Sequence, residues 1–177
     1  MDEFPHTPNF LNLASKNAET AMKALLSRAV DLGVKKADLS QDKQQIIETI
    51  RSFNPNRFEL VSKKLLEEGL NVSDLSREEL LDRMLGIDFL VTSEGKTIAI
   101  DVTSGKGSVL YNKRRKMNQL SNIYIALGID HAVVVRIKRD LDDDSILDLF
   151  SRIQNNLYEG NQFCTVVNFT ANKGRVI

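Results

Sequence analysis

Two neighbouring stretches of mostly apolar residues predict a pair of strands, around which the rest of the chain is organised. The first stretch runs from Ile87 to Thr92 and the second from Lys96 to Thr103. Between them, Ser93-Glu94-Gly95 offers a glycine for the positive φ of a hairpin turn. Both faces of each stretch are mostly apolar, which is typical of strands covered on both sides. We therefore expect a hairpin inside the sheet of an α/β domain.

Two carboxylates interrupt these apolar strands. Asp88 lies in the first strand, and Asp101 lies in the second, on the same face as Ala99. An unpaired carboxylate is costly to bury, and two that lie close together raise each other's pKa. A divalent cation would remove this cost, because hard cations prefer oxygen ligands. The alternative is that each aspartate lies at a strand end and caps a loop or meets an arginine.

Helical periodicity dominates the chain ahead of the hairpin. Apolar positions recur at helical spacing from Leu11 to Leu32, and again from about Gln41 to Phe53 with Ser40 as N-cap. These helices form the helical N-terminal extension that we expect over residues 1–54, followed by an α/β core at residues 55–177, in one compact domain overall. Packing against the core is the favoured role of the extension, and dimerisation or DNA docking is the alternative.

Two more helices are expected between this extension and the hairpin. Asn54-Pro55 opens a helix that runs from Arg57 to Glu68, with proline at its first position. A capping box over Ser76–Glu79 then starts a short helix from Arg77 to Leu85. Between the two helices, Leu70–Val72 is a weak candidate for a third strand that would precede the hairpin.

Strands and helices also alternate after the hairpin. A helix is expected to continue to about Leu127 and to end at Gly128. The later elements are a strand, a helix and a strand, over His131–Lys138, Asp143–Tyr158 and Gln162–Thr170. This order predicts an α/β fold in which helices flank a mixed sheet.

The two aspartates carry a resemblance to a known family. Gly-Ile-Asp88, twelve intervening residues, and then Asp101-Val-Thr resemble the metal-binding core of the PD-(D/E)XK nuclease superfamily, the restriction-endonuclease-like proteins. The resemblance implies an α-β-β-β-α-β core in which Asp88, Asp101 and the backbone carbonyl of Val102 hold Mg²⁺ or Mn²⁺. One position departs from the family pattern, because Thr103 stands where the family normally has a lysine.

The missing lysine directs attention to other catalytic candidates. Lys113 and Lys116, three residues apart on one helical face, are the expected replacements, and Lys106 is a third candidate. The family also carries a glutamate near the start of its first core helix, and Glu59 is the candidate for that position. The alternative for Glu59 is a solvated side chain that the helix dipole favours.

Charge adds a local signal to this picture. The chain has 24 Lys and Arg against 24 Asp and Glu, so its formal net charge is zero and does not by itself indicate a nucleic-acid partner. A basic cluster without acids nevertheless follows the second strand, and it consists of Lys106, Lys113, Arg114, Arg115 and Lys116. A DNA backbone would lie against such a cluster beside a two-aspartate site, and a solvated helix face is the alternative.

The resemblance therefore implies an Mg²⁺-dependent DNA endonuclease that hydrolyses phosphodiester bonds, with a homodimer expected for symmetric cutting of two strands. The first alternative is a catalytically inactive nuclease-fold protein that acts in DNA binding or protein assembly. The second is a small-molecule-binding domain, for which a glycine-rich phosphate loop is missing. A lone cysteine, Cys164, is expected in the core and indicates a reducing compartment, and no run reaches the length of a membrane span. We expect a cytoplasmic protein.

Overall fold

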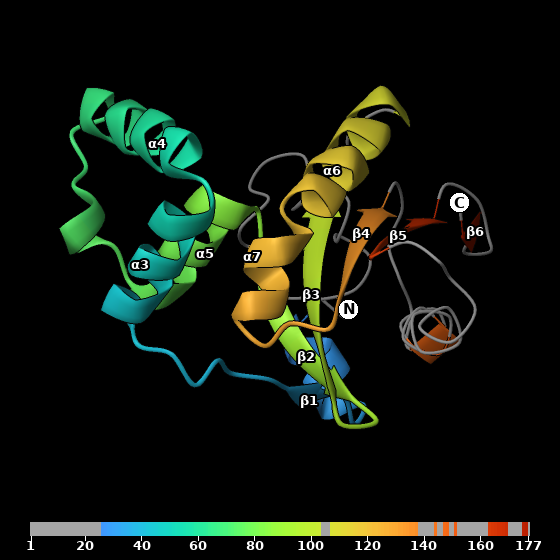
Figure 1. The fold of residues 1–177 in the computed structure, drawn as a ribbon. Coiled ribbons are helices and arrows are strands. Elements are labelled where there is room, and N and C mark those ends of the chain that lie inside the picture. Colours follow the sequence, from blue (N-terminus) through green and yellow to red (C-terminus); the bar gives the residue numbers. More distant parts are fainter. Residues whose placement is uncertain are drawn as a thin grey trace, which may run out of the picture.

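A six-stranded mixed sheet forms the centre of the molecule, with the strands in the order of the sequence. The structure is a computed structural model, and it describes residues 26–103, 107–137, 144, 147–148, 151, 163–169 and 175–176. The strands are β1 (Lys35–Lys36), β2 (Phe89–Ser93), β3 (Lys96–Thr103), β4 (His131–Ile137), β5 (Cys164–Phe169) and β6 (Arg175–Val176). The helices are α3 (Lys43–Phe53), α4 (Pro55–Glu67), the 3₁₀ turn η1 (Val72–Asp74), α5 (Arg77–Leu85), α6 (Gly107–Gln119) and α7 (Ser121–Ala126) (Figure 1).

The predicted hairpin is present and lies inside the sheet. β2 and β3 pair antiparallel, and β3 then pairs parallel with β4. The turn consists of Glu94 and Gly95, both with positive φ (51° and 78°), which is the two-residue geometry that matches the twist of paired strands. β4 and β5 are also parallel, whereas the outer strands β1 and β6 are antiparallel to their neighbours. The α/β class and the mixed sheet are thus confirmed.

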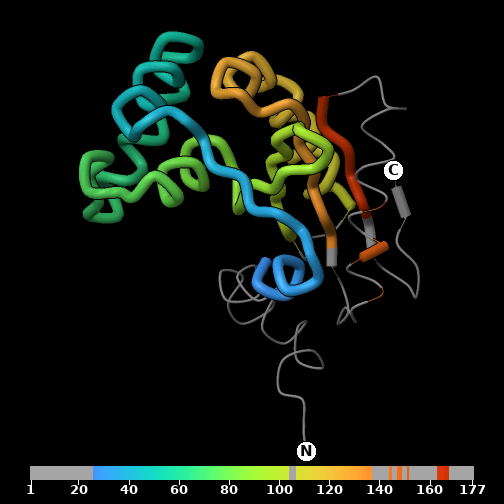
Figure 2. Tube along the Cα trace, turned by 90° about the horizontal axis from the view of Figure 1, so that it is seen from below, coloured from blue at the N-terminus to red at the C-terminus, as the bar shows by residue number. Residues whose placement is uncertain are grey.

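The strand ahead of the hairpin is β1, and the sequence analysis missed it. Lys36 pairs with Val91 of β2, so a part of the expected helical extension belongs to the sheet. The boundary expected at residue 54 therefore does not separate a helical extension from the sheet. The weak candidate Leu70–Val72 is wrong, because the chain there leads into the 3₁₀ turn η1. Figure 2 shows the extended chain running from the helical residues 26–31 past the sheet and on into α3.

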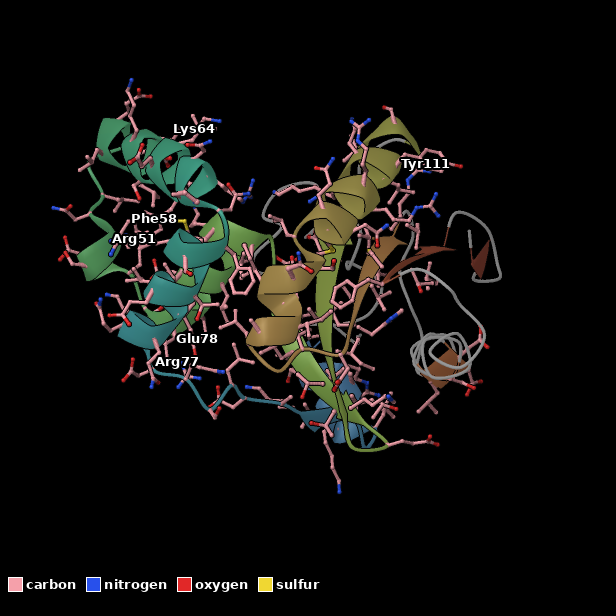
Figure 3. The ribbon with its side chains drawn as sticks, in the orientation of Figure 1. Arg51, Phe58, Lys64, Arg77, Glu78 and Tyr111 are labelled. Atoms are coloured by element: carbon pink, nitrogen blue, oxygen red, sulfur yellow. The ribbon has the colours of Figure 1, made fainter. Side chains whose placement is uncertain are left out.

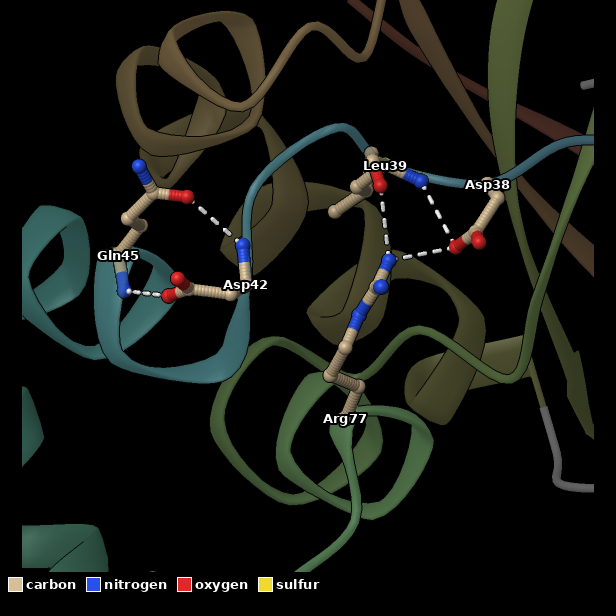
Figure 4. Close-up of polar contacts among 5 residues, drawn as sticks. All are labelled: Asp38, Leu39, Asp42, Gln45 and Arg77. Carbon is tan, nitrogen blue, oxygen red and sulfur yellow. Dashed lines mark hydrogen bonds and ion pairs between the residues drawn. The ribbon is translucent and has the colours of Figure 1, made fainter.

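A helical unit of α3, α4, η1 and α5 is inserted between β1 and β2. Helix α3 begins at Lys43 with Asp42 as N-cap, two residues later than the predicted cap at Ser40. The Asp42 carboxylate accepts from the Gln45 N–H at 2.8 Å, and the Gln45 side chain accepts from the Asp42 N–H at 2.8 Å (Figure 4). This reciprocal capping box satisfies two backbone donors, which Ser40 does not do.

One arginine joins this unit to the segment that leaves the sheet. Arg77, at the start of α5, donates to the Asp38 carboxylate at 2.5 Å and to the Leu39 carbonyl at 2.8 Å (Figure 4). The capping box of Ser76 and Glu79 is confirmed, and so is the stop at Gly86, which has a φ of 72°. The start of α4 at Asn54-Pro55 is also confirmed.

Both faces of the sheet are buried, as the apolar strands indicated. One face packs against the helices, and its core contains Leu90, Ala99, Ala132, Val134, Cys164 and Val166 from the strands. The helices contribute Ile46, Ile50, Leu65, Leu80, Met84, Leu110, Met117 and Tyr124, among others. On the other face, Val91, Ile98, Ile100, Val133, Val135 and Val167 are at most 1% exposed. The predicted core position of Cys164 is confirmed.

The connection from β3 to β4 consists of two helices where one was predicted. The chain leaves helical geometry at Leu120, which separates α6 from α7. The predicted segments 11–25 and Lys106 lie outside the described residues, and so does most of the helix predicted over 143–158. Among the described helices, none is long and apolar enough to cross a membrane.

Candidate active site

The two aspartates meet where the hairpin strands join the rest of the sheet. Asp101 lies in β3 and is 5% exposed, and Asp88 lies directly before β2. The Asp88 N–H donates to the Ile100 carbonyl at 2.9 Å, and the Asp88 carboxylate accepts from the Val102 N–H at 2.7 Å. The backbone of β3 therefore fixes both the main chain and the side chain of Asp88.

The aspartates share a proton-binding environment. Burial and, next, the negative charge of Asp101 raise the pKa of Asp88 to about 8, and the hydrogen bond from Val102 opposes this rise. A hydrogen bond with the Asp101 side chain also favours the protonated form of Asp88. At neutral pH the Asp88 carboxyl is therefore held in its protonated form.

One of the two predicted replacement lysines contacts this pair. The Lys113 ammonium, on α6, lies 2.8 Å from a carboxylate oxygen of Asp101. The Lys113 side chain is about one-third exposed, whereas that of Asp101 is almost completely buried. A lysine from the following helix thus reaches the second aspartate. It supplies the positive charge that Thr103, two residues after Asp101 in β3, does not carry.

The second predicted lysine lies one turn further along α6 and points to a different place. The Lys116 ammonium is directed at the end of α5, where it lies 3.7 Å from the position that a Cβ on Gly86 would occupy. Burial, followed by the positive charge of Arg57, lowers the pKa of Lys116. Within the described part of the chain, the Lys116 ammonium has no hydrogen bond or ion pair.

Two further side chains converge on the same end of α5, and the sequence analysis assigned neither of them to the site. Arg57, in the first turn of α4, donates through Nε to the Met84 carbonyl at 2.8 Å. The hydroxyl of Tyr124, on α7, donates to the Leu85 carbonyl. No sequence pattern marks Arg57, because its place depends on how α4 packs beside α5.

The remaining predicted site residues are not brought to the aspartates. Glu59 is exposed on α4 and makes no contact with the pair in the described chain. Arg114 and Arg115 lie on another side of α6 from Lys113 and Lys116. There, with Tyr111 and other α6 residues, they line a shallow surface hollow of about 510 Å³. Figure 3 shows Tyr111 on the side of α6 that faces away from α3, α4 and α5. The basic cluster thus divides into two faces.

The oxygen atoms around the pair fit a hard divalent cation. In a strand, the N–H and C=O of one residue point to the same side, so the Val102 carbonyl lies on the side of Asp88. Two carboxylates and this carbonyl are oxygen donors, which suits Mg²⁺, an ion that keeps several waters when the protein offers few ligands. Among the described residues, no group of three His, Cys, Asp or Glu side chains is arranged to hold a metal. The aspartate pair would therefore leave positions open for water and substrate.

Asp88 is also accessible from the surface. Asp88 lines one part of a groove of about 980 Å³ that runs along α5 and the β1–β2 edge. Asp82 and Arg83 of α5 line the same groove, together with Ile87 and Phe89. A ligand can thus approach Asp88 along α5 without opening the core.

No protein-family model, no curated protein and no solved structure matches this chain. The resemblance to the PD-(D/E)XK nucleases stays a prediction that depends on the site geometry.

Proposed function

We propose that the protein is a metal-dependent nuclease that hydrolyses phosphodiester bonds of DNA. The observation that carries this proposal is the contact of Lys113 with Asp101 beside Asp88. The two carboxylates come from the β2–β3 hairpin, and the ammonium comes from α6, the helix that follows it. The nuclease pattern requires these three groups, and α6 supplies the cation that Thr103 does not.

The order of the elements supports a restriction-endonuclease-like core. The helical residues 26–31, then β1, β2 and β3, then α6 and finally β4 reproduce the α-β-β-β-α-β order of the family. The helical unit of α3 to α5 is then an insertion between the first two strands. Under this assignment α4 is not the first core helix, so Glu59 loses its proposed role.

The residues divide the chemistry between them. Asp88, Asp101 and the Val102 carbonyl would hold Mg²⁺, and Asp88 would release its proton as the ion binds. The ion supplies an activated water and stabilises charge on the phosphate oxygens. The Lys113 ammonium, 2.8 Å from Asp101, would donate to the attacking water or to a phosphate oxygen.

Cleavage of DNA in Mg²⁺ or Mn²⁺ tests this proposal. We expect Asp88→Ala and Asp101→Ala to abolish cutting. Lys113→Ala should lower the rate by roughly two to three orders of magnitude while metal affinity is kept, because the ammonium acts on phosphate or water. The matched control is Lys64→Ala, an exposed cation on α4, which should cut normally. Cutting that survives both aspartate substitutions would indicate a contaminating nuclease and refute the proposal.

A catalytically inactive DNA-binding protein is the second candidate, and one observation favours it. With Asp88 protonated and Asp101 paired to Lys113, the site is close to neutral without a metal. Such a protein would bind DNA with an affinity that falls steeply with salt, but it would show no metal affinity at pH 8. Calorimetry with Mg²⁺ and Mn²⁺ at that pH separates the two candidates.

A further inference from the structure

Two cations from distant parts of the sequence converge on one end of α5. Arg57 reaches it from α4 and donates to the Met84 carbonyl at 2.8 Å. Lys116 reaches it from α6, and its ammonium lies 3.7 Å from the Cβ position of Gly86. Their charges act on each other, because Arg57 is the strongest charged influence on Lys116. Two like charges thus lie together, one on a half-buried arginine and one on an exposed lysine.

Neither cation forms an ion pair in the described part of the chain, although the negative charges of Asp101 and Asp82 also act on Lys116. Lys116 has no hydrogen bond or ion pair there, and Arg57 uses only Nε, on an uncharged carbonyl. The C-terminal end of a helix attracts a cation through its dipole, which explains one charge. A second cation in the same place adds repulsion, and an anion between the two would offset it.

The cations also lie next to the aspartate pair. The end of α5 continues directly into Ile87 and Asp88, and Lys116 feels the charges of Asp101 and Lys113. Unused guanidinium donors and a nearby ammonium are the groups that bind phosphate oxygens in proteins. An anion held here would therefore lie beside the place where the metal ligands and Lys113 meet.

We propose that Arg57 and Lys116 form a subsite for a phosphate group of the nucleic-acid backbone, next to the Asp88–Asp101 pair. That the phosphate belongs to a nucleic acid rests on the proposed function, whereas the anion site itself rests on the two cations. The helical unit that carries Arg57 then forms one wall of the substrate site, and α6 forms the other.

Binding of phosphate to metal-free protein tests the subsite without requiring cleavage. The probes are inorganic phosphate and the dinucleotide thymidylyl-thymidine, which contains a single phosphodiester, each titrated by calorimetry. We expect Arg57→Gln and Lys116→Met each to weaken binding by about tenfold or more, as for loss of a charge-assisted hydrogen bond. The matched controls are Arg51→Gln and Lys64→Met, exposed cations on α3 and α4, and they should bind as the wild type does (Figure 3).

A second measurement uses the wild-type chain and does not depend on the folding of a variant. Phosphate should shift the lysine side-chain NMR signal that disappears in Lys116→Met, and the shift should saturate with the same affinity. If Arg57 and Lys116 only stabilise the end of α5, the substitutions would lower the melting temperature, and phosphate would move neither signal nor melting temperature. That result would overturn the subsite.

The outcomes separate the subsite from the nuclease. Metal-dependent cleavage without saturable phosphate binding would overturn the subsite and leave the nuclease standing. Phosphate binding that requires both cations, in a protein that cuts nothing, would support the subsite and contradict the nuclease. If inorganic phosphate binds but the dinucleotide does not compete with it, the site is not for a backbone phosphate, and the proposal is wrong.

Discussion

Replacing the titratable carboxyl of Asp88 with an amide should stabilise the protein, and the gain should depend on pH. In Asp88→Asn, the side-chain carbonyl can still accept from the Val102 N–H, and the new amide can donate to Asp101. The substitution thus keeps the packing and the hydrogen bonds while it abolishes the titration. The folded wild-type protein holds the carboxyl in its protonated form. At any pH at which the unfolded chain loses that proton, the free energy of unfolding of the wild type is therefore lowered.

The sign and size follow from the raised pKa. Below about pH 4 the carboxyl is protonated in both states, so wild type and variant should be equally stable. Above it the unfolded state releases the proton and the folded state keeps it until pH 8, so the wild type loses stability with rising pH. One pKa unit corresponds to about 1.4 kcal/mol, which gives about 6 kcal/mol for the whole shift. Because Asp88 is partly exposed and coupled to Asp101, we expect about 3 kcal/mol at pH 9.

Urea unfolding followed by circular dichroism at pH 4, 6.5 and 9, without divalent metal, measures this difference. The control is Asp130→Asn, because the Asp130 carboxylate also accepts a backbone N–H, from Thr97 at 2.8 Å, but is exposed. The control should not gain stability as the pH rises. A variant that is no more stable than wild type at pH 9, or a gain that is the same at every pH, would refute the account of a buried, coupled carboxyl pair.

Three further predictions concern the same region. Metal affinity should rise by up to about tenfold per pH unit below pH 8, because the ion displaces the proton of Asp88, and calorimetry in buffers of different ionisation enthalpy would count that proton. Tyr124→Phe should cost about 1–3 kcal/mol in urea unfolding, because the buried Leu85 carbonyl loses its donor. Ser76→Ala should cost about 1 kcal/mol and Glu79→Gln less, because the glutamine oxygen still accepts from the Ser76 N–H and only the charge is lost, and thermal melts of both variants would rank them.

The sequence predicted the carboxylate pair for a physical reason. Alternation with period two assigns each strand residue to a face, so an aspartate in an apolar strand is visible as an exception. The hairpin turn then aligned Asp88 and Asp101 on neighbouring strands. Helical spacing likewise indicated Lys113 and Lys116 as the candidates for the replacement lysine. Which of the two contacts Asp101 depends on where α6 crosses β3, and no local pattern contains that information.

Other features were missed because they exist only through tertiary contacts. β1 consists of Lys35 and Lys36, which show no apolar alternation and become a strand by pairing with β2. Arg57 looks like any basic residue in a first helical turn until α5 lies beside it. The sequence analysis placed the N-cap of α3 at Ser40 because two capping residues, Ser40 and Asp42, lie two positions apart. The reciprocal hydrogen bonds with Gln45 make Asp42 the N-cap in the structure.

The short outer strands restrict how two copies of this protein can associate. β1 and β6 each contain two residues, and three of these four residues are basic: Lys35, Lys36 and Arg175. A long, flat outer strand is a template on which another chain can add, and short, positively charged strands prevent such growth. A dimer that cuts both strands of a duplex would therefore have to join through helices or loops. Its two active sites would then be spaced by those contacts and not by a sheet that continues from one copy into the next.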